Sequence, residues 1–195
     1  MMKNKTYLVT GAAGFIGAAI AKRLIIEGHF VVTIDNLSTG FINNIPKGVV
    51  FIEGDCQDKK TINKLINYKF DAIFHVAGQS SGEISFDNPV YDLQTNAQST
   101  LLLLDLALKT NCTKFIYAST MSIYGDQKNM PANEKVIIRP KSFYGVGKIA
   151  SEHYMRIYQE YGISSTALRL FNVYGPGQNL QNLKQGMVSI FIAQA

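Results

Sequence analysis

A tyrosine and a lysine four residues apart, Tyr144 and Lys148, are the side chains of this sequence best suited to do chemistry. On a helix, residues i and i+4 lie on the same face, one turn apart. A cation held beside a phenol favours the phenolate, so we expect Lys148 to lower the pKa of Tyr144. Such a tyrosine can act as a general acid or base near neutral pH. Many helices contain this pair by chance, so it needs support from other residues.

Support comes from a glycine-rich turn near the N-terminus, with Gly11, Gly14 and Gly17 spaced as Gly-x-x-Gly-x-x-Gly. The turn follows a short apolar strand expected at 6–10 and opens a helix expected at 15–27, the context of a dinucleotide-binding turn. Its glycines let the backbone approach a pyrophosphate, and the helix N-terminus offers free N–H groups and a positive dipole. A plain tight turn is the alternative. The glycine-rich turn and the tyrosine–lysine pair together predict redox chemistry on a hydroxyl or a ketone.

Two carboxylates follow the next two expected strands. Asp35 ends the first of them, where it could accept both ribose hydroxyls of adenosine and would repel a 2′-phosphate. This favours NAD over NADP, although Asp35 could also be an N-cap or turn residue. Asp55 ends the second strand, where it could meet the edge of the adenine, and a turn aspartate is nearly as well supported.

The elements that must position these residues alternate along the chain. Apolar runs bounded by turn residues predict strands, and apolar residues at helical spacing predict helices. The expected strands lie at 6–10, 30–34, 49–52, 71–76, 114–118 and 165–170, and the expected helices at 15–27, 58–68, 90–110 and 142–161. This alternation predicts an α/β fold with a doubly wound parallel sheet. The second half of the helix at 90–110 is apolar almost all round, which predicts burial on more than one side.

Composition excludes several classes of function. The chain has 195 residues, 47% hydrophobic and 17% charged, as in an ordinary globular domain. Its net charge of +5 comes with scattered lysines and no basic run, so we expect no nucleic-acid partner. The longest leucine run, Leu101 to Leu104, is far too short to span a bilayer, so we expect no membrane anchor. The two cysteines, Cys56 and Cys112, have no metal-site spacing and favour a reducing, cytoplasmic location. The chain stops within an apolar run at 187–195 that begins a new helix, which predicts a part of a longer protein.

Seven short motifs together identify a family. They are Gly11-Ala12-Ala13-Gly14-Phe15-Ile16-Gly17, Asp35-Asn36-Leu37, Gly54-Asp55, His75-Val76-Ala77-Gly78, Ser119-Thr120-Met121-Ser122-Ile123-Tyr124-Gly125, Tyr144-Gly145-Val146-Gly147-Lys148, and Arg169-Leu170-Phe171-Asn172-Val173-Tyr174-Gly175-Pro176-Gly177. With these motifs in the order in which the family has them, the sequence resembles the extended short-chain dehydrogenase/reductase family of nucleotide-sugar epimerases and dehydratases. The resemblance implies a Rossmann-type NAD-binding domain at 1–175 and the start of a substrate-binding region at 176–195.

The resemblance also implies roles for single residues. Tyr144 matches the catalytic acid/base, Lys148 the lysine that binds the nicotinamide ribose and lowers the pKa of the tyrosine, and Thr120 the hydroxyl on the reacting sugar oxygen. Ser119 is the alternative to Thr120, one position away. The implied cofactor-binding residues are Gly11, Gly14, Phe15, Ile16, Gly17, Asp35, Asn36, Asp55, Cys56, Val76, Ala77, Gly78, Gln79, Asn96, Tyr144, Lys148 and Phe171. The implied substrate-binding residues are Ser80, Thr120, Tyr124, Tyr144 and Asn172, and no metal is implied.

Some of these roles have structural alternatives. Asn96 could brace its helix, and Tyr124 could be a packed tyrosine rather than a sugar-pocket residue. We expect His75, at the end of a buried strand, to be a packed and hydrogen-bonded histidine rather than a catalyst.

The residues after Thr120 separate the reactions of the family. Sugar dehydratases place an acid pair where this sequence has Met121 and Ser122, and the decarboxylases usually place a glutamate at the second position. Neither Met121 nor Ser122 can do that proton work. The resemblance therefore implies NAD-dependent epimerisation of a nucleotide-diphosphate sugar, most simply a UDP-sugar, at C4 through a transient 4-keto intermediate. The alternatives are an NAD(P)H-dependent reductase, a dehydratase, or an NAD-binding module without turnover. A homodimer through the two long helices is also implied.

Overall fold

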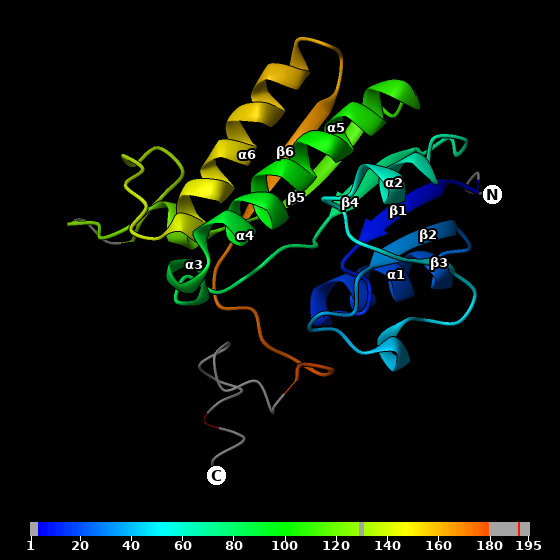
Figure 1. Ribbon diagram of the computed structural model, residues 1–195, viewed down its shortest axis with the longest axis horizontal. Helices are drawn as coiled ribbons and strands as arrows, with labels where there is room; N and C mark the ends of the chain where they lie inside the picture. The colour runs from blue at the N-terminus through cyan, green and yellow to red at the C-terminus, as the bar shows by residue number, and fades with distance from the viewer. Residues whose placement is uncertain (1–3, 129–130, 180–190, 192–195) are drawn as a thin grey trace.

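A computed structural model describes residues 4–128, 131–179 and 191 of the chain. Figure 1 shows a twisted sheet flanked by helices, with the C-terminal segment leaving β6 at one end of the sheet. The expected helix at 187–195 and most of the polar stretch before it lie outside the described residues.

The sheet has six strands, and every pairing between them is parallel. The strands are β1 (Thr6–Thr10), β2 (Phe30–Asp35), β3 (Val50–Glu53), β4 (Ala72–His75), β5 (Lys114–Thr120) and β6 (Ser164–Leu170). Their order is β3-β2-β1-β4-β5-β6, so the chain winds outward from β1 to β3 and then returns to β4 on the other side. The predicted doubly wound parallel sheet is confirmed, and ligands in such folds bind where the winding reverses.

Burial follows the place of each strand in the sheet. The inner strand β1 ends in three buried residues, whereas the edge strand β6 has no buried residue and alternates between half-buried and exposed positions. Strands covered on both faces read as continuous apolar runs, which is why β1 and β2 are recognisable in the sequence. Two apolar clusters fill the two sides of the sheet. The larger is built around Leu8, Leu103 and Phe115, and the smaller around Val9, Ala21 and Val31.

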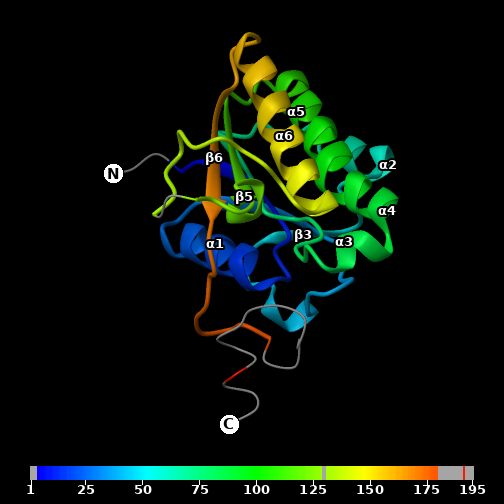
Figure 2. The same cartoon turned by 90° about the vertical axis from the view of Figure 1, so that its left-hand side faces the viewer.

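The helices form one layer on each side of the sheet. They are α1 (Phe15–Ile26), α2 (Lys59–Asn63), α3 (Ile84–Asp87), α4 (Pro89–Leu93), α5 (Ser99–Lys109) and α6 (Phe143–Gln159), with short 3₁₀ turns η1 (Ile42–Asn44) and η3 (Met121–Ile123). Figure 2 shows α4, α5 and α6 on one side of the sheet and α1 on the other. The two long helices α5 and α6 run side by side across β5 and β6 in Figure 1.

The helix expected at 90–110 is interrupted by a π-helical turn. Asn88 accepts a hydrogen bond from the Tyr91 backbone N–H (3.1 Å) and Pro89 opens α4, after which the π-helical turn η2 (Gln94–Gln98) leads into α5. Such a turn inserts a residue into the helix and changes which side chains face the neighbouring helix. It places Thr95, Asn96 and Ala97 among the buried residues.

Other differences from the sequence prediction are local. The helix expected at 58–68 ends at Asn63, and the chain continues through turns to Tyr68. The short α3, η1 and η3 were not predicted, because three or four residues are too few to show a period. Within the residues that the structure describes, no helix is both long and apolar enough to cross a membrane.

Candidate functional site

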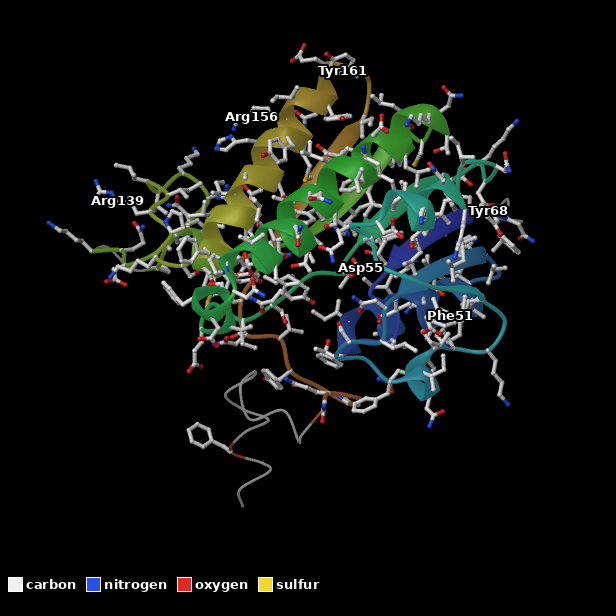
Figure 3. All side chains as sticks on the ribbon, in the orientation of Figure 1. Phe51, Asp55, Tyr68, Arg139, Arg156 and Tyr161 are labelled. Carbon is white, nitrogen blue, oxygen red and sulfur yellow. The ribbon has the colours of Figure 1, made fainter. Side chains whose placement is uncertain are left out.

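A cleft of about 710 Å³ lies across the carboxyl ends of all six strands. Its walls come from the glycine turn after β1, the loops after β2 to β4, the end of β5, the first turns of α6 and the segment after β6. This volume is within the usual range for small-ligand sites. Asp55, two residues after the end of β3, lines this cleft and is labelled near the middle of the molecule in Figure 3.

The glycine turn has the shape that a pyrophosphate requires. Gly11 has φ 72°, and a β-carbon there would stand 2.8 Å from the backbone N of Ala77. At Gly17 a β-carbon would collide with the carbonyl oxygen of Gly11. Gly14 caps α1 without any side-chain hydrogen bond, so the first N–H groups of α1 stay available for an anion. These residues fit the phosphates of a dinucleotide.

Asp35 lies at the end of β2 and touches the glycine turn. Its carboxylate accepts hydrogen bonds from the backbone N–H groups of Ala13 (2.9 Å) and Leu37 (2.8 Å), which fixes it at the cleft wall. Each oxygen keeps a lone pair for a further donor. Asn36 donates to Asp55 (2.9 Å), so the loops after β2 and β3 are joined at this end of the cleft. The carboxylate is therefore placed to accept ribose hydroxyls.

The floor of the cleft is the chain after β4. The Thr10 hydroxyl accepts hydrogen bonds from the backbone N–H groups of Val76 and Ala77, both at 3.1 Å, and so joins the floor to β1. His75 is fully buried, with Thr10 Oγ1 2.9 Å from its Nδ1 and Ser99 Oγ 3.2 Å from its Nε2. Burial lowers the pKa of His75 to about 3, and the charge of Lys148 contributes. His75 is thus a neutral, packed histidine, as the sequence predicts.

Tyr144 and Lys148 lie in the first turns of α6 and face the cleft. Ser142 caps this helix by accepting a hydrogen bond from the Gly145 N–H (3.1 Å). The Lys148 ammonium donates to the carbonyl of Ala118 (3.0 Å) and lies 4.7 Å from the ring centre of Tyr117 and 5.6 Å from that of Tyr144. Both side chains are buried, so their proton chemistry is governed by desolvation.

The predicted lowering of the Tyr144 pKa is wrong for this geometry. Burial raises the pKa of Tyr144, the charge of Asp92 adds to the rise, and a hydrogen bond with Thr120 opposes it. Lys148 does not reverse the shift because its ammonium contacts ring faces and a carbonyl. Burial also lowers the pKa of Lys148 from 10.5 to about 8, opposed by the charge of Asp92.

Thr120 and Ser119 end β5 and differ in their partners. Ser119 donates to Glu152 Oε1 (2.5 Å), and Glu152 also accepts from Arg169 Nε (3.1 Å) and Nη2 (2.8 Å). Thr120 Oγ1 instead lies 3.2 Å from Ser122 Oγ and interacts with Tyr144. This difference favours Thr120 over Ser119 as the hydroxyl that works with Tyr144.

The cleft gathers most of the residues that the sequence singled out. Those that line it are Gly11, Gly14, Phe15, Ile16, Gly17, Asp35, Asn36, Asp55, Cys56, Val76, Ala77, Gly78, Gln79, Ser80, Ser119, Thr120, Tyr144, Lys148, Phe171 and Asn172. Asn96 and Tyr124 do not line it. Asn96 is fully buried and donates to Gln79 O (3.0 Å), so it braces the floor. Tyr124 is buried under Arg169, whose Nη1 donates to its hydroxyl (3.3 Å).

Sequence reasoning missed two parts of the wall. The loop after β2 contributes Ser38, Thr39, Gly40 and Phe41, and the chain before α3 contributes Ser81, Gly82 and Glu83. A β-carbon at Gly40 would stand 2.7 Å from the carbonyl carbon of Ala13, so this loop packs on the glycine turn. The Ser-Thr-Gly run directly after Asp35-Asn36-Leu37 could have signalled it. No cluster of metal-ligating side chains occurs in the described part of the chain.

Comparison with known proteins agrees with this arrangement. Residues 7–195 match the family model described as the NAD dependent epimerase/dehydratase family. The chain belongs to this family. It is an extended short-chain dehydrogenase/reductase with a Rossmann-type fold, and the expected cofactor, NAD, is confirmed.

Individual relatives of the family are similar over nearly the whole chain. A putative UDP-glucose 4-epimerase of Methanocaldococcus jannaschii is 38% identical over 95% of this chain. The structure of a Thermotoga maritima UDP-glucose 4-epimerase with UDP-glucose superposes with a TM-score of 0.92 at 37% identity over 95% of this chain. A Thermus thermophilus UDP-glucose 4-epimerase in complex with NAD gives 0.88 at 37% identity over 96%. The chain spans 61%, 61% and 60% of the lengths of these three proteins.

Proposed function

We propose that the parent protein is an NAD-dependent epimerase that inverts C4 of a nucleotide-diphosphate sugar through a transient 4-keto intermediate. The observation that carries the proposal is the meeting of Thr120, Tyr144 and Lys148 in the cleft, beside Met121 and Ser122. The first three residues supply proton transfer and charge, and the last two supply no acid. A reversible oxidation needs only the former set together with the cofactor.

The residues of the chain divide the work of this reaction. Tyr144, once ionised, takes the proton of the sugar 4-hydroxyl and returns it at the end, while Thr120 accepts or donates a hydrogen bond at the same oxygen. Burial alone opposes this ionisation by raising the pKa of Tyr144, and the positive charge of bound NAD⁺ would favour it. The ammonium of Lys148 stabilises negative charge on the reacting oxygens. NAD, when bound, supplies the chemistry of accepting a hydride from C4 and giving it back to the opposite face. The glycine turn and Asp35 would hold its phosphates and adenosine ribose.

Met121 and Ser122 argue against the dehydratase alternative. Both side chains line the cleft directly after Thr120, so they stand where a second proton-transfer group would have to act. A thioether cannot transfer a proton, and an uncharged serine is too weak an acid to replace a carboxylic acid. Asp35 argues against an NADPH-dependent reductase because its carboxylate would repel a 2′-phosphate.

The substrate class rests on the relatives. The Thermotoga protein was crystallised with UDP-glucose, and the Methanocaldococcus protein is described as a putative UDP-glucose 4-epimerase. We propose a UDP-sugar for this protein, with Asn172 and Ser80 among its contacts, since both line the cleft.

We further propose that residues 1–175 are the NAD-binding domain and that 176–195 begin the substrate-binding region. On this division, residues 1–195 alone bind NAD but turn over a sugar poorly or not at all. On this proposal, residues 1–195 are an NAD-binding module without turnover, and the full-length protein is the epimerase. We also propose a cytoplasmic location.

Exposed apolar side chains support a homodimer through the two long helices. Val90 and Leu93 of the α4 segment and Val146 and Ile157 of α6 are each more than half exposed. Helices α4 and α6 contact one another and form one layer on the outside of the sheet in Figure 2, so these residues come from a single helical layer. Exposed apolar residues grouped on packed helices are typical of subunit interfaces.

The test uses the full-length protein and its Tyr144→Phe variant. We expect the variant to bind NAD⁺ but to lose at least a hundredfold of its UDP-sugar epimerisation rate, since acid–base catalysis contributes about 10²–10⁴-fold. Tyr68→Phe is the matched control, because Tyr68 lies at the far end of the sheet from the cleft in Figure 3. An undiminished rate in Tyr144→Phe would remove the assignment. Mass spectrometry of NAD released on denaturation separates an epimerase that retains its cofactor from a reductase that exchanges it.

A further inference from the structure

A buried carboxylate stands behind the cleft, and the proposed reaction does not use it. Asp92 lies on α4 and is only 1% exposed. Its Oδ2 accepts hydrogen bonds from Gln79 Nε2 (2.8 Å) and Asn96 Nδ2 (3.1 Å). Its Oδ1 has no hydrogen-bond donor among the described residues. A buried carboxylate is costly unless charge or hydrogen bonds compensate for it, so this one calls for an explanation.

The packing of α4 against α6 brings this carboxylate to the catalytic turn. A β-carbon at Gly147 would stand 3.4 Å from Asp92 Oδ1 and 3.5 Å from the β-carbon of Asn96. Asp92 Oδ1 therefore lies against α6 at Gly147, directly beside Lys148. Burial raises the pKa of Asp92, whereas the hydrogen bond from Gln79 and the charge of Lys148 oppose the rise. The charge of Asp92 in turn raises the pKa of Lys148, so each group favours the charged form of the other.

The same carboxylate also organises the floor of the cleft. Gln79, held by Asp92, donates through Nε2 to Ser81 O (2.7 Å), and its Oε1 accepts from the Ser81 N–H. Asn96 reaches Gln79 O from the π-helical turn η2. A β-carbon at Gly78 would collide with Asn96 Oδ1 and stand 3.4 Å from Lys148 Nζ. The hydrogen-bond network and the ammonium thus meet at Gly78.

Asp92 is the acidic group in the surroundings of Lys148. The titratable groups that face the ammonium are Asp92 from α4, His75 from β4, Tyr117 from β5 and Tyr144 from α6. Burial keeps His75 neutral and raises the pKa of both tyrosines, so neither ring oxygen is ionised at neutral pH. The negative charge opposite the ammonium therefore comes from Asp92.

We propose that Asp92 is a positioning residue for Lys148: its buried carboxylate is the counter-charge that holds the ammonium at the cleft and, through Gln79, fixes the floor at residues 79–81. It touches neither the sugar nor the reacting atoms. The inference rests on the proposed function only for the role of Lys148. Its test contains no sugar, so a failure of the epimerase assignment leaves the result readable.

The test compares Asp92→Asn with wild type in chains carrying ¹³C-labelled lysine. The Lys148 resonance is identified by its disappearance in Lys148→Met. We expect its titration midpoint to move below the wild-type value of about 8, because the attraction that favours the ammonium is lost. We also expect NAD⁺ affinity, measured by calorimetry at pH 7, to fall about tenfold, since a buried hydrogen bond to a charged group at the cleft floor is lost.

Two further variants separate the two arms of the proposal. Asp105→Asn is the control, because Asp105 forms an exposed ion pair with Lys109 (2.6 Å), and it should change neither quantity. Gln79→Leu should weaken NAD⁺ binding and leave the Lys148 midpoint in place. The proposal is overturned if Asp92→Asn leaves the midpoint unmoved or raises it. If Asp92→Asn does not fold, Asp92→Ser decides: its smaller side chain also removes the charge, so it must also lower the midpoint.

Discussion

Replacing Lys148 by methionine should stabilise the fold at neutral pH, although it removes a proposed catalytic group. Lys148 is only 4% exposed, and burial lowers its pKa from 10.5 to about 8. Since each pKa unit is worth about 1.4 kcal/mol, holding the ammonium inside costs the native state about 3 kcal/mol. Methionine has a similar length and carries no charge, so it escapes this cost.

Part of the gain is lost with the contacts of the ammonium. Methionine cannot donate to the carbonyl of Ala118, and a buried carbonyl without a donor costs about 1 kcal/mol. The buried carboxylate of Asp92 also loses its counter-charge and keeps only the hydrogen bonds from Gln79 and Asn96, which costs about 1 kcal/mol more. The net gain in the free energy of unfolding at pH 7 is therefore about 1 kcal/mol, which for a chain of this size corresponds to a rise in Tm of about 2–4 °C.

The stability advantage of the methionine variant should depend on pH. Below pH 8, Lys148 is protonated in both the folded and the unfolded chain, so the native state bears the full cost. Between pH 8 and 10.5 the unfolded chain binds more protons than the folded one, and wild-type stability rises relative to the variant. Above pH 10.5 both states are neutral, and the advantage of methionine disappears.

The assay is urea unfolding of both proteins at several pH values from 7 to 10.5, with the difference between them as the readout. Taking the difference cancels the tyrosines and cysteines that titrate in the same range. A variant that is less stable than wild type at pH 7, with a difference independent of pH, would show that Lys148 is not a buried cation under strain.

Three further predictions concern the cofactor and the fold. Gly17→Ala should abolish NAD⁺ binding by calorimetry, because its methyl group would collide with the carbonyl of Gly11. Gly162→Ala, where φ is 87° and nothing lies within 4 Å, should cost about 1 kcal/mol of stability and leave the affinity unchanged. Asp35→Ser should weaken NAD⁺ binding about tenfold and bring NADP⁺ closer to it in affinity, since a charge-assisted acceptor and a repulsive charge are both lost. Glu152→Gln should lower the free energy of unfolding by about 2–3 kcal/mol, because it leaves the half-buried charge of Arg169 without its partner carboxylate. The double variant Glu152→Leu with Arg169→Met should lose less free energy of unfolding than the sum of the losses of the two single variants.

The parts of the fold that depend on period and punctuation were predictable. The boundaries of β1 agree with the prediction, and those of α1 agree to one residue, because an apolar run and a glycine turn mark them. The π-helical turn was not predictable, since an inserted residue leaves the apolar pattern of 90–110 nearly unchanged. The burial that fixes Asn96 there appears only when α4 and α6 are packed together.

The candidate site also has features that the sequence predicts and features that it does not. Residues at strand ends, such as Asp35 and Thr120, were predictable because parallel strands bring their carboxyl ends to one edge. The direction of the Tyr144 pKa was not, because it depends on how much water the fold removes. Asp92 carries no motif of its own, and its place beside Lys148 appears only when α4 packs against α6.

The winding of the sheet also sets the order in which the site can form. Tyr7 on β1 pairs with Val31 and with Ala72, so the central strand acquires its second neighbour only from a residue 65 positions further along the chain. The last strand, β6, pairs with β5 over seven residues that include Ser119 and Thr120. During synthesis the cofactor turn can therefore be complete while the end of β5 still lacks its outer neighbour. Such a chain exposes an unpaired strand edge beside the half-made cleft, and this is the stage at which it is most exposed to aggregation.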